Sequence, residues 1–337
     1  MISNRAVTVF GAYGHTGRFV VSELLKRGWT AILAGRDATK LKALADTNPG
    51  LDMRVATVED RESLDRAVSG AAAVINCAGP LLDTAPAVIY AALRERIHYL
   101  DVAAEQAAVL ATFKDFAGVS RDAGVMVVPA MAFYGGLGDL LATAAMGDWA
   151  VADEILILTA LDSWKPTHGT RLTGQRNHGR PFIFSNKKLD RGDPPPPCTW
   201  NFSPPFGQQD MEGLPLSETI TISQHLKTAE IRAYLNLPAI REVRDPNTPT
   251  PTAADDSGRS SQIFLLEAVV RRGGAERRAM ARGRDIYAIT APIVAEATER
   301  AVNGLAKKSG VLAAGEAFDA RDFLTSLSRR NLCFEIR

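Results

Sequence analysis

The chain has 337 residues, which is longer than one hydrophobic core usually supports, so we expect two domains. Its 39 lysines and arginines nearly balance its 38 aspartates and glutamates, which gives no electrostatic reason to expect nucleic acid or an anionic membrane as a partner. This balance favours a small-molecule substrate.

Cysteine usage and one apolar stretch bear on the cellular setting. Cys77, Cys198 and Cys333 form neither a paired disulfide framework nor a zinc-binding spacing, and no secretion signal opens the chain, so we expect a cytoplasmic protein without a metal site. Residues 124–146 are apolar enough to suggest a membrane span, but Pro129, Asp139 and several glycines favour a strand, a loop and a helix over a stable span.

The first 130 residues alternate short β-branched runs with helical stretches. The expected strands are 6–10, 30–33, 53–57, 72–76, 98–100 and 125–128. The expected helices are 16–27, 38–46, 61–68, 86–95 and 105–123. This alternation predicts an α/β fold with a doubly wound parallel sheet of Rossmann type.

After Tyr134 the alternation of strand and helix stops. The pattern predicts a helix at 137–146, a strand at 154–159, two long strands around Gly273 and Gly274, and weaker strands at 218–223 and 229–234. Residues 193–197 and 244–261 predict loops, of which the second is either mobile or a lid. Helices at 285–303 and 318–327 and an edge strand at 331–336 follow. The middle of the chain therefore predicts an α+β domain whose sheet is mostly antiparallel.

A glycine-rich turn follows the first strand and opens the first helix. Gly11 permits a tight turn, Gly14 lets a pyrophosphate approach the backbone, and Gly17 lets the helix pack closely on the strand. The helix amino terminus adds free N–H donors and a partial positive charge. We expect the turn to bind a dinucleotide through Gly11, Tyr13, Gly14, His15, Thr16 and Gly17.

The end of the second strand indicates which dinucleotide is bound. Gly35 and Arg36 stand where an enzyme for NAD carries a carboxylate that holds the ribose hydroxyl. A guanidinium can make paired, charge-assisted contacts to a 2′-phosphate, so Arg36, assisted by Lys40, predicts NADP as the cofactor. Asp37 is expected to cap the next helix instead.

The turn after the fourth strand should line the ribose and nicotinamide, because ligands of open parallel sheets bind outside the carboxyl ends of the strands. It contributes Cys77, Ala78, Gly79 and Pro80. With no base in its motif, Cys77 is expected to be an apolar filler and not a nucleophile.

The stretches GAYGHTGR at 11–18, INCAGP at 75–80 and HYLDVAAE at 98–105 resemble three successive motifs of the saccharopine dehydrogenase-like oxidoreductases and the related trans-acting enoyl reductases. Residues 283–304 and 310–324 resemble the closing helix and tail of that family. Ala104 departs from the family pattern, which has glycine before the glutamate, and residues 129–134 lack the usual glycine-rich form.

The resemblance implies an NADP-binding Rossmann domain of residues 1–134 and 285–337, interrupted by a substrate or dimerisation domain at 135–284. Because members of this family frequently form dimers, it also makes a homodimer the assembly to test. The substrate is not implied.

Hydride transfer needs orientation, a dry pocket and an acid that protonates the reduced atom. Three residues are candidates for that acid: Asp101 at the end of the fifth strand, Tyr134 after the sixth, and His168 beside Gly169 and Thr170. Each has a structural alternative, which is helix capping for Asp101, packing for Tyr134 and simple solvation for His168. No tyrosine here begins a Tyr-x-x-x-Lys motif, which excludes the extended short-chain dehydrogenases.

Three functions remain open from the sequence. The first is an NADPH-dependent reductase acting on a C=N or activated C=C bond of a small metabolite. The alternative is a non-catalytic Rossmann protein that senses NADP(H), and the third is a structural or lipid-associated protein, which would require residues 124–146 to be exposed. An anion-binding surface on the arginine-rich hairpin at 271–284 competes with a simple solvated face, which the pattern favours.

Overall fold

The computed structural model describes residues 5–176, 179–328 and 332–337, and these fall into two compact units. The first unit comprises the described residues up to Ala132, with Thr290–Leu312 and Glu316–Phe318. The second comprises Phe133–Ile289, Ala313–Gly315 and the described residues after Phe318. Residues after Phe318 therefore group with the second unit, whereas the resemblance had assigned the whole of 285–337 to the first.

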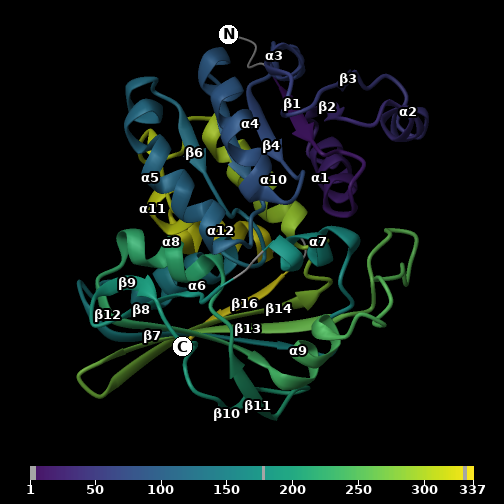
Figure 1. Ribbon diagram of the computed structural model, residues 1–337. Helices are drawn as coiled ribbons and strands as arrows, with labels where there is room; N and C mark the ends of the chain where they lie inside the picture. Colours follow the sequence, from purple (N-terminus) through teal and green to yellow (C-terminus); the bar gives the residue numbers. More distant parts are fainter. Residues whose placement is uncertain (1–4, 177–178, 329–331) are drawn as a thin grey trace. The chain divides into compact units, whose positions relative to one another are not determined.

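The first unit is built on a parallel sheet in the order β15-β6-β5-β4-β1-β2-β3 (Figure 1). Its strands are β1 (Ala6–Phe10), β2 (Thr30–Gly35), β3 (Met53–Val55), β4 (Ala73–Asn76), β5 (His98–Asp101), β6 (Met126–Val128) and β15 (Gly310–Val311). β1 is an interior strand, because its residues pair with both β2 and β4. The predicted Rossmann sheet is confirmed, with β15 as an additional edge strand.

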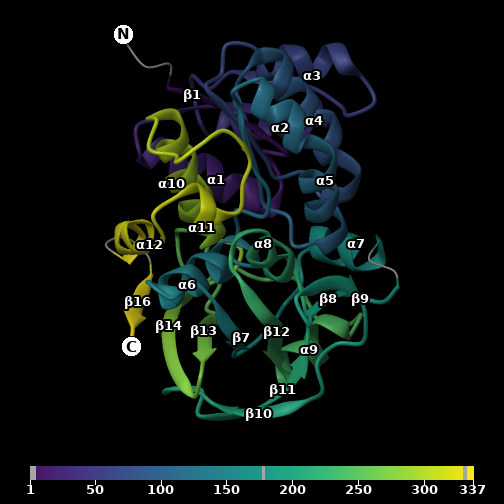
Figure 2. The ribbon, with the colours of Figure 1, turned by 90° about the vertical axis from the view of Figure 1, so that its left-hand side faces the viewer.

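Helices cover both faces of this sheet (Figure 2). They are α1 (His15–Lys26), α2 (Ala38–Asp46), α3 (Arg61–Val68), α4 (Leu81–Glu95), α5 (Gln106–Asp122) and α10 (Thr290–Val302). α1 and α10 pack side by side, and on the other face α4 packs between α3 and α5. A short helix, α11 (Ala314–Ala317), follows β15.

The expected start of α4 was wrong by five residues. Pro86 was taken as the first helical residue, but the helix begins at Leu81 and Pro86 lies inside it. The buried Glu105 carboxylate accepts a hydrogen bond of 2.8 Å from the Leu81 N–H, which gives this helix end an acceptor from another element. No residue near Leu81 in the sequence indicates that Glu105, 24 residues later, accepts this hydrogen bond.

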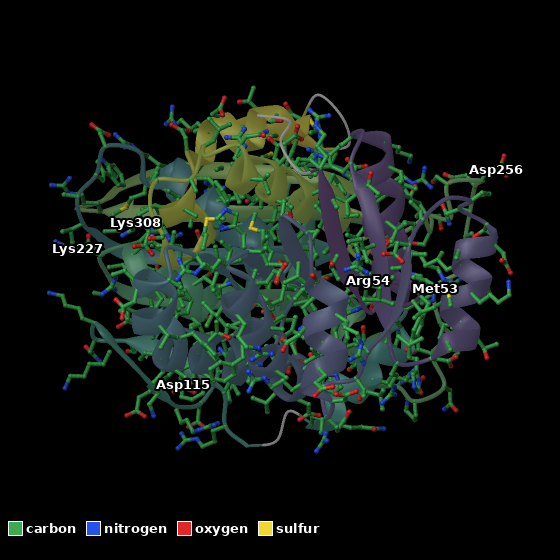
Figure 3. The ribbon with its side chains drawn as sticks, turned by 90° about the horizontal axis from the view of Figure 1, so that it is seen from above. Met53, Arg54, Asp115, Lys227, Asp256 and Lys308 are labelled. Atoms are coloured by element: carbon green, nitrogen blue, oxygen red, sulfur yellow. The ribbon has the colours of Figure 1, made fainter. Side chains whose placement is uncertain are left out.

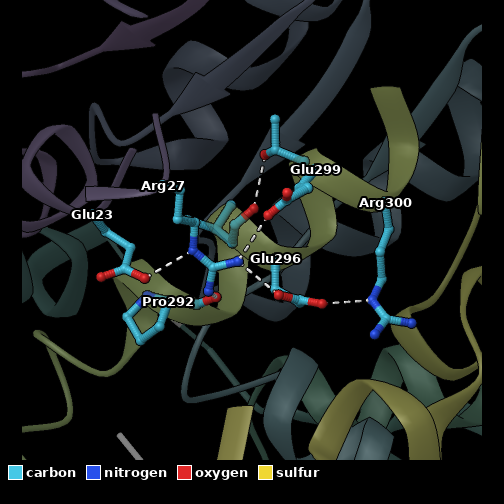
Figure 4. Close-up of polar contacts among 8 residues, drawn as sticks. Glu23, Arg27, Pro292, Glu296, Glu299 and Arg300 are labelled. Carbon is cyan, nitrogen blue, oxygen red and sulfur yellow. Dashed lines mark hydrogen bonds and ion pairs between the residues drawn. The ribbon is translucent and has the colours of Figure 1, made fainter. Parts of the chain in front are cut away.

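A buried ion-pair cluster joins α10 to α1 within the first unit (Figure 4). The Arg27 guanidinium lies 2.8 Å from a Glu23 carboxylate oxygen and 2.6 Å from a Glu296 oxygen, and it also contacts Glu299 at 3.2 Å. Glu296 in turn binds Arg300 at 2.8 Å. Removing one partner from such a cluster leaves an uncompensated buried charge, so these contacts connect α10 with the end of α1.

The outer strand β3 carries Met53 and Arg54, which are labelled in Figure 3. Met53 is exposed, as expected of a strand with one free edge. Arg54 donates to the carbonyl oxygens of Arg66 at 2.9 Å and Ser69 at 2.6 Å, at the carboxyl end of α3. The edge strand is thus held to its neighbouring helix by a side chain.

The second unit contains a mixed, mostly antiparallel sheet in the order β10-β11-β12-β7-β13-β14-β16, with β8 pairing with β12 and β9. Its strands are β7 (Ala152–Leu161), β8 (Phe182–Ser185), β9 (Lys188–Arg191), β10 (Cys198–Asn201), β11 (Gln208–Gly213), β12 (Thr228–Asn236), β13 (Ile263–Arg272), β14 (Ala275–Arg284) and β16 (Cys333–Ile336). β7 and β12 are parallel, and the other pairs are antiparallel. The hairpin around Gly273 and the edge strand β16 are confirmed, although Asn331, the first residue of the predicted edge strand, lies outside the described residues.

Five helices belong mainly to this unit: α6 (Gly136–Met146), α7 (His168–Arg176), α8 (Ser217–His225), α9 (Leu237–Arg244) and α12 (Ala320–Ser328). The strand expected at 218–223 was wrong, because these residues form most of α8. Alternating Thr and Ile suggested a strand, but residues from Ser217 to Ile222 are all buried, so packing on several sides overrides the local preference. α6 packs on α8 and on the strands β13 and β14.

The structure also decides between the alternatives for two segments, the apolar stretch 124–146 and the arginine-rich hairpin 271–284. The apolar stretch 124–146 divides between β6 and the buried helix α6, which removes the basis of the lipid-associated reading. Among the described residues, no helix has the length and apolarity needed to cross a bilayer. On the hairpin, arginines 271, 277, 278, 282 and 284 each form an ion pair with an acid, which agrees with the solvated face favoured by the sequence.

Candidate dinucleotide and proton-transfer sites

The glycine turn after β1 has no room for larger residues. Gly11 has a φ of 85°, and a Cβ there would lie 2.8 Å from the Ala78 nitrogen. A Cβ at Gly17 would lie 2.2 Å from the Gly11 carbonyl oxygen. Helix α1 starts without a side-chain cap and has no acid in its first turn. The turn therefore presents backbone and a positive helix end, which suits the pyrophosphate of a dinucleotide.

Around this turn, Tyr13 is half-buried, and its ring would clash with a Cβ at Gly35, only 2.8 Å away. His15 is exposed and packs edge-on against Phe19, with ring centroids 5.4 Å apart. Thr16 is half-buried in the first turn of α1. Contact of these side chains with the cofactor remains a prediction.

Arg36 lies exposed directly after β2. Among the described residues its guanidinium makes no hydrogen bond or ion pair, and a hydrogen bond from Thr57 together with the Arg36 charge lowers the pKa of Glu59. Lys40 already has two partners, because its ammonium lies 3.3 Å from the Asp37 carboxylate and 5.7 Å from the centre of the Tyr13 ring. Asp37 accepts a hydrogen bond of 3.0 Å from the Lys40 N–H, which confirms it as the cap of α2. Arg36 is therefore the cation here with the freest donors for a 2′-phosphate.

The loop after β4 lies beside the glycine turn, as the closeness of Ala78 to Gly11 shows. Asn76 holds this loop, because its side-chain oxygen accepts a hydrogen bond of 3.0 Å from the Ala78 N–H. Gly79 is exposed, whereas Cys77, Ala78 and Pro80 are half-buried. Asn76 was missed as a site residue, although it opens the motif at 75–80.

Burial and the neighbouring Asp101 carboxylate raise the pKa of the Cys77 thiol well above its usual value. A thiol in that environment stays protonated at neutral pH and is a poor nucleophile. This agrees with the expected role of Cys77 as a small filler.

Asp101 is fully engaged beneath the loop. One carboxylate oxygen accepts hydrogen bonds from the N–H groups of Ala103 at 3.0 Å and Ala130 at 2.7 Å. The other accepts one of 2.9 Å from the Tyr99 hydroxyl, which in turn accepts from Asn76 at 3.3 Å. Burial raises the pKa of Asp101 to about 6, although these hydrogen bonds act in the opposite direction. The network fixes the ends of β4 and β5, and proton donation by Asp101 stays a prediction.

In the second unit, Tyr134 belongs to an aromatic cluster. Its ring centroid lies 4.9 Å from that of Phe133 and 5.4 Å from that of Trp164. The hydroxyl is buried and has no hydrogen-bond partner among the described residues. Burial, together with the charges of Tyr287 and Glu218, raises the pKa of Tyr134 well above its usual value.

His168 is exposed as the first residue of α7. The segment before it is organised around Tyr287, whose hydroxyl accepts from the Trp164 indole at 3.1 Å and lies 2.9 Å from the Thr170 hydroxyl oxygen. Trp164 therefore connects the surroundings of Tyr134 with the start of α7. Neither Tyr287 nor Glu218, a buried acid of α8, was expected from the sequence as a site residue.

No cluster of potential metal ligands is found among the residues that the structure describes. The groups that could donate hydrogen bonds to a ligand are backbone N–H groups, hydroxyls and the Arg36 guanidinium. Such a set suits an organic cofactor with phosphate groups.

Comparison with known families supports the cofactor assignment. Residues 7–128 match the family model of the saccharopine dehydrogenase NADP binding domain. The resemblance seen in the motifs at 11–18, 75–80 and 98–105 is thereby confirmed, and NADP is the cofactor. None of the curated protein sequences matches this chain.

Solved structures extend the likeness to the fold. The apo form of histidine-tagged saccharopine dehydrogenase (L-Glu forming) from Saccharomyces cerevisiae matches over 99% of this chain and 100% of its own, with a TM-score of 0.68 and 13% identity. At that identity the match shows a shared fold. 3-Hydroxyacyl-CoA dehydrogenase type-2 from Mycobacterium avium covers 38% of this chain and 72% of its own with a TM-score of 0.34 and 16% identity, which is too distant to support any argument.

Proposed function

Because this chain is a saccharopine dehydrogenase-like oxidoreductase that binds NADP, we propose that it reduces a C=N or activated C=C bond of a small metabolite with NADPH. The observation that carries the proposal is the uncapped glycine turn at the start of α1 together with the exposed Arg36, which forms no ion pair among the described residues. In this reaction the reduced nicotinamide supplies a hydride. The chain has to bind the cofactor, exclude water and deliver one proton.

Within the first unit, Gly11, Gly14 and Gly17 would receive the pyrophosphate and Arg36 the 2′-phosphate. The loop from Cys77 to Pro80 would line the nicotinamide side. Since both Asp101 carboxylate oxygens already accept hydrogen bonds, Tyr134 and His168 in the second unit become the stronger candidates for the proton donor.

The same full engagement of Asp101 also favours the alternative, an NADP(H)-sensing protein without turnover. The two functions are separated by measuring NADPH binding and NADPH oxidation on the same preparation. Imines formed from 2-oxo acids and amines, enoyl thioesters and quinones are the substrate classes to screen. Oxidation with one class supports the reductase, whereas tight NADPH binding without oxidation with any of them overturns it in favour of the sensor.

A homodimer in the cytoplasm is the remaining part of the proposal. Sedimentation of the purified chain at several concentrations tests the assembly, and a monomer at all of them would contradict it.

A further inference from the structure

Glu218 is a buried carboxylate at the start of α8 that no part of the expected site accounts for. One of its oxygens accepts a hydrogen bond of 3.2 Å from the Leu216 N–H. The other accepts one of 3.2 Å from the N–H of Gly135, the residue directly after Tyr134. The carboxylate is thus fixed against the segment that carries the Tyr134 side chain.

Hydroxyl groups without partners gather on the same two segments. The structure contains four buried side-chain polar atoms without a partner among its described residues, and three of them belong to Tyr134, Ser217 and Thr219. Ser217 and Thr219 flank Glu218 and are themselves completely buried. A buried hydroxyl without a partner costs about 1–3 kcal/mol, so a water or a polar ligand that bound the Tyr134 hydroxyl would relieve this cost.

Among the described residues, Glu218 forms no ion pair with a charged side chain. Burial raises its pKa to about 7, while hydrogen bonds from the backbone N–H groups of Glu218, Leu216 and Gly135 lower it. The elements packed against α8 carry four titratable groups. Asp139 of α6 binds His225. On β12, Glu230 binds Ser185, Arg232 binds Glu154, and Tyr234 is the fourth group. An acid that exchanges its proton near neutral pH is suited to general acid catalysis.

We propose that Tyr134 donates the proton of the reduction and that Glu218 positions its hydroxyl and returns the proton to it through a bridging water. This inference rests on the proposed reductase function. It adds to that function a residue that lies outside the three expected acids.

The carbon of the double bond receives a hydride, with its two electrons, from the reduced nicotinamide, and the π electron pair moves to the nitrogen or to the electron-withdrawing end of the conjugated system. The O–H bond of Tyr134 breaks, and its proton joins that atom. The resulting phenolate takes a proton by way of the water from the Glu218 carboxyl, which leaves a carboxylate that solvent protonates again.

The two variants Glu218→Gln and Tyr134→Phe separate these roles. Tyr134→Phe should slow even the first turnover by about 10²–10⁴-fold, the usual contribution of a general acid. Glu218→Gln should keep the first turnover largely intact but slow the following ones. In the unaltered chain kcat should fall as pH rises through about 7, because the carboxyl must be protonated, and Glu218→Gln should lose this dependence.

The matched control is Glu267→Gln. Glu267 is also buried in the second unit, and its pKa is also raised by burial, but its carboxylate binds the Trp200 indole at 3.0 Å. On β13 it alternates with Phe264, Leu266 and Ala268, so it lies on the opposite face of the sheet from Phe264, the neighbour of Phe133. This variant should keep the pH profile of kcat.

A second readout does not depend on turnover. Infrared difference spectra between pH 6 and pH 8 should show the loss of a protonated carboxyl group in the unaltered chain and in Glu267→Gln, and this signal should be reduced in Glu218→Gln. NADPH affinity equal to that of the unaltered chain shows that each variant is folded. Turnover by Glu218→Gln with an unchanged pH profile overturns the inference and leaves the reductase standing, whereas tight NADPH binding by the unaltered chain without any turnover overturns both.

Discussion

Replacing Arg36 with alanine tests the origin of cofactor selectivity. The side chain is exposed and forms no hydrogen bond or ion pair among the described residues, so its removal should leave the fold intact. A hydrogen-bonded contact between charged groups contributes about 1.5–3 kcal/mol, which corresponds to a roughly 10- to 150-fold weaker affinity for NADPH. NADH lacks the 2′-phosphate, so its affinity should change little.

Arg36→Asp should have a larger effect on NADPH, because the new carboxylate repels the phosphate. Lys40 should not restore binding fully, since it is shared between Asp37 at 3.3 Å and the Tyr13 ring at 5.7 Å. The loss should be greatest at low ionic strength, where exposed charges are least screened.

The assay measures the affinity of each variant for NADPH and for NADH by calorimetric titration at two salt concentrations. Lys42→Ala is the matched control, because it removes one cation from α2, the helix that follows Arg36, where Lys42 pairs with Asp46 at 2.9 Å. Equal losses for both cofactors in Arg36→Ala would refute contact with the 2′-phosphate. A loss in Lys42→Ala as large as that in Arg36→Ala would indicate a general effect of charge.

Three further predictions concern the frame of the site. Gly17→Ala should abolish NADPH binding in a fluorescence titration, because its Cβ would lie 2.2 Å from a backbone oxygen, whereas Gly118→Ala, with no atom within 4 Å, should bind normally. Arg27→Met should lower the free energy of unfolding by about 3–5 kcal/mol in denaturant titrations, while the exposed Arg66→Ala should change it by less than about 1 kcal/mol. The pKa of Glu218 rises on folding from 4.5 to about 7, so the folded state binds more protons in this window and loses up to about 3 kcal/mol of stability as pH rises through it. Unfolding at pH 5 and pH 8 should therefore show Glu218→Gln gaining stability relative to the unaltered chain at the higher pH, and a constant difference would contradict the raised pKa.

Local chemistry made much of the first unit predictable. β1, α2 and α3 have the predicted bounds because a β-branched run and two aspartate caps, such as Asp37, mark them in the sequence. The glycine turn at Gly11 is recognisable because only glycine fits where a Cβ would touch the next loop. Long-range partners were not predictable, as the capping of α4 by Glu105 shows.

The second unit was harder to predict because its elements depend on tertiary packing. The alternation of Thr and Ile in 219–222 indicated a strand, and only burial of the whole segment explains the helix. Glu218 was missed with it, since a glutamate on an expected strand carries no sign of burial.

The cluster around Arg27 also has a consequence for the order in which the chain can fold during synthesis. Arg27 and its partner Glu296 are 269 residues apart, and Phe133–Ile289, the largest segment of the second unit, is translated between them. The ribosome therefore releases β1 and α1 long before α10 exists to cover them. Until then, the apolar face beneath α10 stays open, and the nascent Rossmann sheet remains vulnerable to aggregation until the last part of the chain emerges.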